Sequence, residues 1–228
     1  MKLLPLTMLM AICQPAWAEI RDNFNGNINF TNNFAYRGID RHSSNEAFFG
    51  NLEYASETGL YGGVWMGNYK TLWGHEADTE TDLYVGYSHN LTFGHTIDTS
   101  LWRGTYNEKT TRDYDWAEWQ VSYHYHDRWG LMFAVADNLY GSDQRSAVAE
   151  VNFVHQTNRL TLVVSLGQQQ FESNYLSDVN YIQTRVSLNW RKWHLFLDSS
   201  FADLKSDTAM FSTKWKTNSN GIGLAYSF

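Results

Sequence analysis

Residues 117–125 read Ala-Glu-Trp-Gln-Val-Ser-Tyr-His-Tyr, and this stretch decides the fold class. Every second side chain from Ala117 to Tyr125 is apolar or aromatic, whereas those between them, from Glu118 to His124, are polar. Successive side chains of a β-strand point to opposite faces, so a strand is the regular element that separates the two sets. The same alternation recurs in several later segments. The sequence therefore predicts an all-β protein.

The connections between strands predict how they are arranged. Alternation along the chain predicts twelve strands, at residues 26–38, 45–56, 60–70, 79–91, 95–107, 115–127, 130–140, 145–157, 159–171, 178–190, 193–204 and 221–228. Short connections alternate with longer, more polar ones such as 69–79, 107–115 and 204–220. Short turns on one side and long loops on the other are typical of an outer-membrane barrel. We therefore expect a single transmembrane antiparallel up-and-down β-barrel with both termini in the periplasm.

The first residues predict a secretory signal peptide rather than a part of the barrel. Lys2 supplies a positive start, residues 3–13 are mostly apolar, and a small-x-small cleavage site ends at Ala18. Cleavage after Ala18 would leave residues 19–228 as an outer-membrane barrel. No mature segment approaches the length of apolar chain that a transmembrane helix needs.

The composition excludes several classes of function. The chain has 228 residues, of which 43% are hydrophobic, 16% aromatic and 18% charged. Its two prolines and its single cysteine, Cys13, all lie within the expected signal peptide, so thiol catalysis and cysteine-ligated metals are excluded. The formal net charge of −7 offers no basic surface for nucleic acid. The absence of mature proline suits a closed barrel. Proline has no backbone N–H, so it would leave a carbonyl of the neighbouring strand without a hydrogen bond, and lipid cannot supply one.

A water-soluble exported β-sandwich or lipocalin-like barrel would also show alternation. Two observations count against it. Apolar faces run along all twelve expected strands, which is more than one small core needs. Tryptophans also lie near the expected strand ends, where amphipathic rings favour the headgroup region. We expect Trp129, Trp190 and Trp193 beside the short turns, and Trp73 and Trp116 beside the opposite loops.

Residues 34–39 read Phe-Ala-Tyr-Arg-Gly-Ile, and they are followed by Leu-Glu-Tyr at 52–54 and Gly-Leu-Tyr-Gly-Gly-Val-Trp at 59–65 with Asn68. This start resembles that of the TorF-type porins, a proteobacterial outer-membrane family also called Gcw_chp. The resemblance covers residues 24–70 at the level of motifs, and beyond them only the rhythm of strands and turns. It implies a barrel of about this strand count and a pore. It supplies no catalytic residues.

The end of the chain resembles a more general signal. Outer-membrane barrels tend to end in a strand with a glycine and two aromatic residues that the barrel-assembly machinery reads. Gly223, Tyr226 and Phe228 fall in that register, although Gly221 stands where the pattern has a polar side chain. We therefore expect the assembly machinery and outer-membrane lipid as partners.

The polar phase of the strands predicts the residues that line a pore. Pointed inward, it gives Arg37, Glu53, Asp82, Asp98, Glu118, His124, His126, Glu150, Arg185 and Asp198. One interpretation is a narrow porin for passive diffusion of small hydrophilic solutes, weakly preferring cations because acids outnumber bases in this set. The alternative is a non-conducting structural or surface-interaction barrel, in which these charges form a plugging network and the loops, including 204–220, meet a partner.

Two patterns of reactive side chains also occur in the sequence. His124 and His126 would share one strand face with Glu118, but no third ligand follows at a diagnostic spacing, so we expect no metal site. His42 and Ser44 have the spacing of outer-membrane phospholipases, in which an amide side chain orients the histidine. Asn45 cannot orient His42 from its position. We therefore expect neither a cofactor nor an enzymatic activity.

Overall fold

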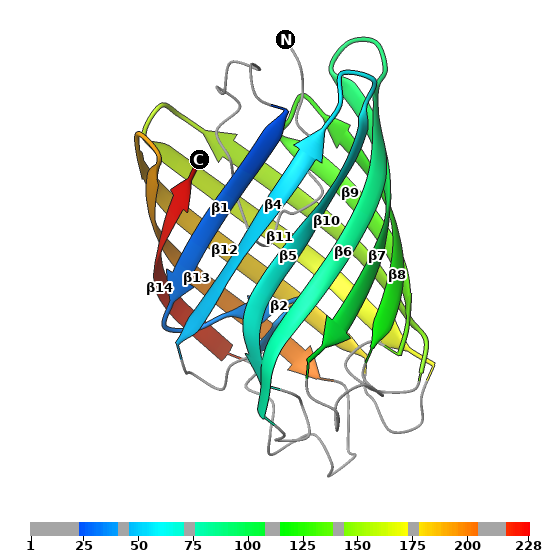
Figure 1. Cartoon of the computed structure of the whole chain (residues 1–228), viewed down its shortest axis with the longest axis vertical. Helices are drawn as coiled ribbons and strands as arrows, with labels where there is room; N and C mark the ends of the chain where they lie inside the picture. Colours follow the sequence, from blue (N-terminus) through cyan, green and yellow to red (C-terminus); the bar gives the residue numbers. More distant parts are fainter. Residues whose placement is uncertain are drawn as a thin grey trace.

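The computed structural model describes residues 23–40, 46–70, 76–107, 115–138, 144–172, 178–204 and 218–228. They form a closed barrel of twelve antiparallel strands in which neighbours follow the chain order and β1 pairs with β14 (Figure 1). The barrel strands are β1 (Phe24–Thr31), β4 (Ala47–Ala55), β5 (Leu60–Lys70), β6 (Glu76–Asn90), β7 (His95–Tyr106), β8 (Trp116–Tyr125), β9 (Trp129–Asp137), β10 (Ser146–Gln156), β11 (Leu160–Phe171), β12 (Val179–Trp190), β13 (Trp193–Leu204) and β14 (Asn218–Ser227). The predicted all-β, twelve-stranded antiparallel barrel is confirmed.

Tight turns gather at one end of the barrel. The β4–β5, β6–β7, β8–β9, β10–β11 and β12–β13 connections are short and lie at the end shown uppermost in Figure 1. Both ends of the described chain lie there too, because Ala55 N donates to Asn23 O at 2.8 Å and Ser227 N donates to Lys192 O at 2.8 Å. The longer connections leave from the opposite end. Among the described residues, no helix is long and apolar enough to cross a bilayer.

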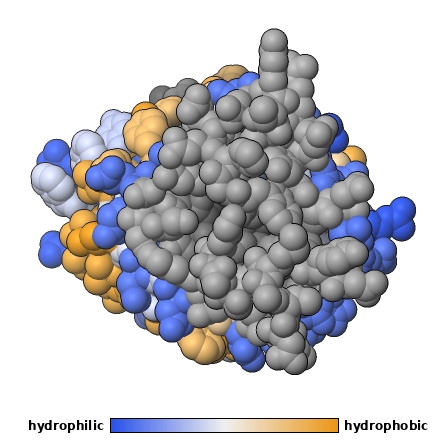
Figure 2. Space-filling view, turned by 90° about the horizontal axis from the view of Figure 1, so that it is seen from below, coloured by the Kyte–Doolittle hydropathy of each residue, from blue (hydrophilic) through white to orange (hydrophobic). Residues whose placement is uncertain are grey.

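The outer face of the barrel is apolar along its middle. Leu83, Leu101, Phe133 and Leu197 point outward, and they are 60%, 58%, 61% and 57% exposed. An apolar outer band with a polar interior is the pattern of a barrel that faces lipid. Seen from the long-loop end, orange apolar side chains lie on parts of the outer circumference, interleaved with blue hydrophilic ones (Figure 2).

The tryptophans divide between the two faces. Trp129, Trp190 and Trp193 are exposed beside the short turns, at 53%, 70% and 43%, as the sequence predicted. Trp116 begins β8 beside a long connection, as expected. The expectation that its ring lies in the headgroup region was wrong, because the ring is buried inside the barrel and its Nε1 donates to Glu80 Oε1 at 3.2 Å. Trp116 shares the inward phase of its strand with Glu118, and that phase decides its direction. Trp73 lies outside the described residues.

Inward rings fill the interior by lying against glycines of the neighbouring strand. An added Cβ at Gly167 would lie 2.2 Å from Cζ of Tyr181, so the ring occupies the space that a side chain would need. The other inward pairs of this kind are Tyr61 on Gly86, Tyr84 on Gly63, Trp116 on Gly104 and Phe196 on Gly223. The barrel interior is consequently aromatic as well as charged.

Candidate functional site

The lumen contains a short hairpin that the sequence did not predict. The expected strand 26–38 ends at Thr31, where Thr31 Oγ1 donates to Asn33 O at 2.8 Å and the chain turns inward. Strands β2 (Ala35–Tyr36) and β3 (Ile39–Asp40) then pair with each other across Arg37 and Gly38. These two residues have φ angles of 50° and 82°, the left-handed conformation of tight hairpin turns.

The hairpin is packed against β12 and β13 on the inside of the barrel. A Cβ added at Gly38 would lie 2.5 Å from Cβ of Tyr181 and 2.9 Å from Cβ of Ala202, so only glycine allows this approach. Ile39 is 1% exposed. Gln183 Nε2 donates to Ala35 O at 3.2 Å. The hairpin is therefore part of the interior and narrows the lumen.

Arg37 reaches from the hairpin tip to β8. Its Nη1 and Nη2 donate to Glu118 Oε2 and Oε1 at 2.6 and 2.8 Å, and the two side chains are 2% and 0% exposed. A bidentate pair of this kind is strong and sets the orientation of both groups. The expectation that Arg37 belongs to the barrel wall was wrong, since it lies on the inserted hairpin.

Inward carboxylates on the wall accept hydrogen bonds from phenol hydroxyls. Tyr61 donates to Asp98 at 2.9 Å, Tyr84 to Glu53 at 3.0 Å. Tyr181 Oη likewise donates to Glu150 at 2.7 Å. These contacts orient the carboxylates through neutral partners. A phenol hydroxyl does not neutralise an ionised carboxylate, so the negative charge stays in the lumen.

Glu80 is an interior carboxylate that sequence reasoning missed. It is 2% exposed and accepts from Tyr106 Oη at 2.9 Å and from Trp116 Nε1 at 3.2 Å. Its position could have been predicted, because it shares the phase of Asp82. The tyrosine donors carried no such signal, since aromatic residues occur on both faces of these strands.

The structure turns most of the expected pore-lining side chains inward. Asp82 is buried, and Arg185 binds Asp198 through Nε and Nη2 at 2.6 and 2.7 Å. Counting only the side chains that the structure describes, the interior holds seven carboxylates and two arginines: Glu53, Glu80, Asp82, Asp98, Glu118, Glu150 and Asp198 with Arg37 and Arg185. Arg103, on the outward phase of β7, is exposed and pairs with Asp115 at 3.4 Å.

His124 and His126, which were expected on one face of a strand, do not share a face. His124 is buried at 4% exposure, and neither of its ring nitrogens has a hydrogen-bond partner among the described residues. His126 lies after the strand end, exposed in the turn with a φ of 50°, so its expected inward position was wrong. Beside it, partial burial raises the pKa of Asp127, an effect that His126 opposes. No three His, Cys, Asp or Glu side chains of the described segments cluster as a metal site requires.

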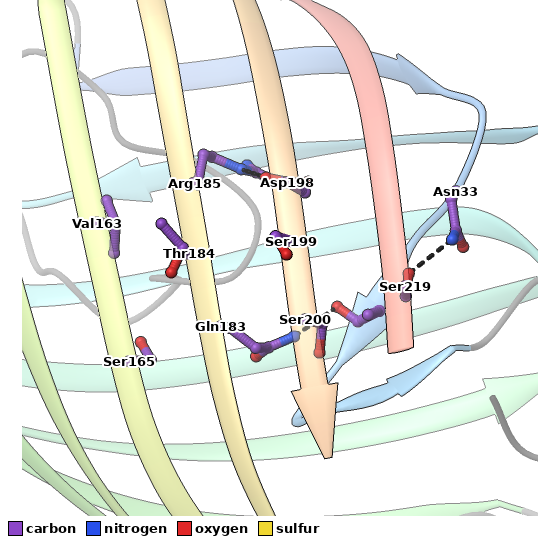
Figure 3. Close-up of a pocket in the computed structure, with 11 residues that line it drawn as sticks. Asn33, Val163, Ser165, Gln183, Thr184, Arg185, Asp198, Ser199, Ser200 and Ser219 are labelled. Atoms are coloured by element: carbon purple, nitrogen blue, oxygen red, sulfur yellow. Dashed lines mark hydrogen bonds and ion pairs between the residues drawn. The ribbon is translucent and has the colours of Figure 1, made fainter. Parts of the chain in front are cut away.

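A polar cavity of about 40 Å³ lies between the hairpin and the β11–β14 wall (Figure 3). Asn33 and Ala35 contribute from the hairpin segment, and the Arg185–Asp198 pair lies in the wall. The remaining lining residues are Val163, Ser165, Gln183, Thr184, Ser199, Ser200 and Ser219. Most of these side chains are small or polar, so the cavity suits water and hydrophilic molecules.

The last residues close the barrel. Phe228 N donates to Gly26 O at 3.0 Å, and its ring lies where a Cβ on Gly26 would be, 2.5 Å away. The Tyr226 ring packs on Trp193 with centroids 4.8 Å apart. The role of Gly223, Tyr226 and Phe228 as an assembly signal stays a prediction. The expected signal peptide, the His42–Ser44 pair and most of loop 204–220 lie outside the described residues.

Comparison with known proteins gives a family match and several solved structures of similar fold. Residues 18–222 match the model of a family described as "Bacterial protein of unknown function (Gcw_chp)". No curated protein matches the chain. The NanC porin superposes with a TM-score of 0.61 at 9% identity, covering 89% of this chain and 98% of that one. The KdgM porin gives 0.55 at 7%, covering 90% and 99%, and has also been solved in complex with disordered oligogalacturonate.

The COG4313 outer membrane channel from Pseudomonas putida F1 gives a TM-score of 0.55 at 11% identity, with 90% of this chain and 94% of that chain covered. At such identities the likeness concerns the fold alone.

Proposed function

Because the chain belongs to the Gcw_chp family and folds as a closed twelve-stranded barrel, we propose that it is a narrow channel of the bacterial outer membrane. It passes small hydrophilic solutes by passive diffusion. The TorF name suggested by the sequence is not part of the family's description. The porin-like fold of NanC and KdgM supports the proposal at the level of architecture.

The orientation follows from the arrangement of turns. In outer-membrane barrels the short turns face the periplasm and the longer loops face outward. The short-turn end, with both described chain ends, is accordingly the periplasmic end of this barrel. The signal peptide that ends at Ala18 directs export.

The observation that carries the proposal is the excess of carboxylates in the lumen. Among the side chains that the structure describes, seven inward acids face two inward arginines, and both arginines are bound to carboxylates. In a narrow, partly desolvated passage an uncompensated charge acts over a longer range than in bulk water. The channel therefore prefers cations and neutral solutes over anions. Oligogalacturonate, with which KdgM has been solved, is a polyanion, and a solute of that charge would be disfavoured in this lumen.

The inserted hairpin is the constriction of this channel. It lies against β12 and β13 and is bound across the lumen to β8 through Arg37. Solutes pass beside it, through the space that includes the polar cavity.

Planar-bilayer recording of the purified barrel tests the proposal. We expect small single-channel currents and a reversal potential of the cation-selective sign under a potassium chloride gradient. Asp98→Asn and Glu53→Gln should each reduce that potential. Asp137→Asn is the matched control, because Asp137 is exposed on the outward phase of β9. An anion-selective wild type, or equal effects of all three variants, would contradict the proposed role of the lumen carboxylates.

One observation favours a second candidate, a non-conducting structural or surface-interaction barrel. Many inward side chains are almost completely buried, including Gln169 at 0% and Thr161 and Asp98 at 1%. If the lumen stays this closely packed, the loops would carry the function by meeting a partner. A folded, heat-modifiable barrel that gives no current in any bilayer would decide for this candidate.

A further inference from the structure

The cavity between the hairpin and the β11–β14 wall is lined by oxygen atoms that lack partners. Within the described residues, Asn33 Oδ1, Gln183 Oε1 and Ser200 Oγ are buried and accept or donate no hydrogen bond. Asn33 and Ser200 are each 5% exposed. A buried polar atom without a partner carries a desolvation cost, so such atoms indicate a site that something else completes.

The neighbouring contacts define which chemistry is missing. Gln183 Nε2 donates to Ala35 O, and Asn33 Nδ2 donates to Ser219 Oγ at 2.6 Å and to Asn220 O at 3.5 Å. A backbone carbonyl can only accept a hydrogen bond, so the amide nitrogens of Gln183 and Asn33 face the carbonyls of Ala35 and Asn220. The amide oxygens of the two side chains therefore have no hydrogen-bond donor. The two amide oxygens need donors, and the Ser200 hydroxyl can take either role. Gln183 and Ser200 are register partners on β12 and β13, and Figure 3 shows them side by side near the hairpin.

The charge of the cavity is balanced. Arg185 and Asp198 are bound to each other through two hydrogen bonds in its wall. A cationic ligand would be repelled by Arg185 and an anionic ligand by Asp198. The opposite charge that either ligand needs is already engaged in this ion pair. The cavity therefore favours a neutral ligand.

Size sets a further limit. The cavity volume is about 40 Å³. Since one water needs roughly 10–15 Å³ on this measure, the space corresponds to about three waters. Three waters share about 90 Å³ in the liquid, so the occupant is limited to a molecule of only a few non-hydrogen atoms.

We propose that this cavity is a subsite for a small neutral solute with several O–H donors, the class of short polyols with glycerol as its simplest member. Its hydroxyls donate to the oxygens of Asn33 and Gln183, and one exchanges a hydrogen bond with Ser200. The inference deepens the proposed function and rests on it for the route by which the solute arrives. The carboxylates elsewhere in the lumen hold back anions, while this cavity retains neutral polyols.

Saturation-transfer NMR on the detergent-purified, full-length barrel tests the subsite without requiring conduction. Glycerol should give a saturable signal with a millimolar dissociation constant. Ser200→Ala should weaken it about three- to tenfold, the usual effect of losing one hydrogen bond. Ser187→Ala is the matched control, because Ser187 is an equally buried inward serine that does not line the cavity. Propane-1,2-diol, with one hydroxyl fewer, should compete more weakly than glycerol.

The outcomes separate the two proposals. A saturable signal in a barrel that carries no current would retain the subsite and overturn the channel. A conducting barrel with no saturable glycerol signal would retain the channel and show that only water fills the cavity, which overturns the subsite. Equal weakening by Ser200→Ala and Ser187→Ala, or tighter competition by protonated ethanolamine than by glycerol, would also overturn it. Val163→Phe, which fills the cavity from β11, should abolish the signal if the site is correctly located.

Discussion

Removing Arg37 should destabilise the barrel more than any other single change to the hairpin. Arg37→Met keeps the length of the side chain but leaves the Glu118 carboxylate buried without its guanidinium. Because the two side chains are 2% and 0% exposed, solvent cannot replace the lost partner unless the hairpin moves. Removing one partner of a buried ion pair costs about 3–5 kcal/mol of unfolding free energy.

A double variant of Arg37 and Glu118 separates the energy of the ion pair from the cost of leaving one of its charges unpaired. Glu118→Leu alone should cost a similar amount, since it leaves the guanidinium buried and unpaired. Combining Arg37→Met with Glu118→Leu removes both charges, and apolar replacement of a buried pair is often close to neutral. We therefore expect the double variant to be more stable than either single one, with a coupling energy of at least about 2 kcal/mol.

The assay is urea-induced unfolding in lipid vesicles, followed by tryptophan fluorescence. Ser187→Ala serves as a control for an inward change away from the hairpin. The reasoning would be refuted if each single variant lost less than about 0.5 kcal/mol, the range of ordinary surface changes. It would also fail if the losses in the double variant simply added, because additivity means that the two groups do not interact.

Three further predictions concern topology, closure and interior packing. Cysteine introduced at Lys109 should react with an impermeant maleimide on whole cells and cysteine at Lys192 should not, whereas the opposite labelling would reverse the orientation. Deleting Phe228 should lower the amount of barrel inserted in the outer membrane more than the stability of barrel already inserted; normal heat-modifiable levels on gels would count against an assembly role. Gly167→Ala places a Cβ 2.2 Å from the Tyr181 ring and should cost about 1–3 kcal/mol in urea unfolding, and an unchanged midpoint would show that the ring shifts freely.

The period-two pattern was sufficient to predict the barrel and most side-chain directions. It placed Glu53, Asp98 and Glu150 on the inner face, because the direction of a side chain depends only on its phase along the strand. The same phase would also have sent Trp116 inward. The expectation of a girdle position for that residue came from a preference of tryptophan, and the geometry of the strand is the stronger constraint.

The inserted hairpin could not be predicted from the period-two pattern. Alternating side chains continue past Thr31, so nothing in the periodicity marks the point where the chain leaves the wall. The local signal was Gly38, which permits the second positive φ of a two-residue turn. The partners of the turn, Glu118 and Tyr181, lie far along the sequence, and only the closed barrel brings them to it. His126 was misplaced for a related reason, since a tight turn begins where the polar pattern still continues.

The hairpin also has a consequence for the order of folding. It lies near the start of the chain, yet Arg37 binds a partner 81 residues away and Asn33 binds one 186 residues away. Contacts of such large sequence separation form late and slowly, because the ends of long loops must first be brought together. A slip of β8 by one residue would turn Glu118 toward lipid and leave Arg37 without its carboxylate. We therefore expect docking of the hairpin to be the step that completes folding, and to favour the correctly registered barrel over barrels with a slipped strand.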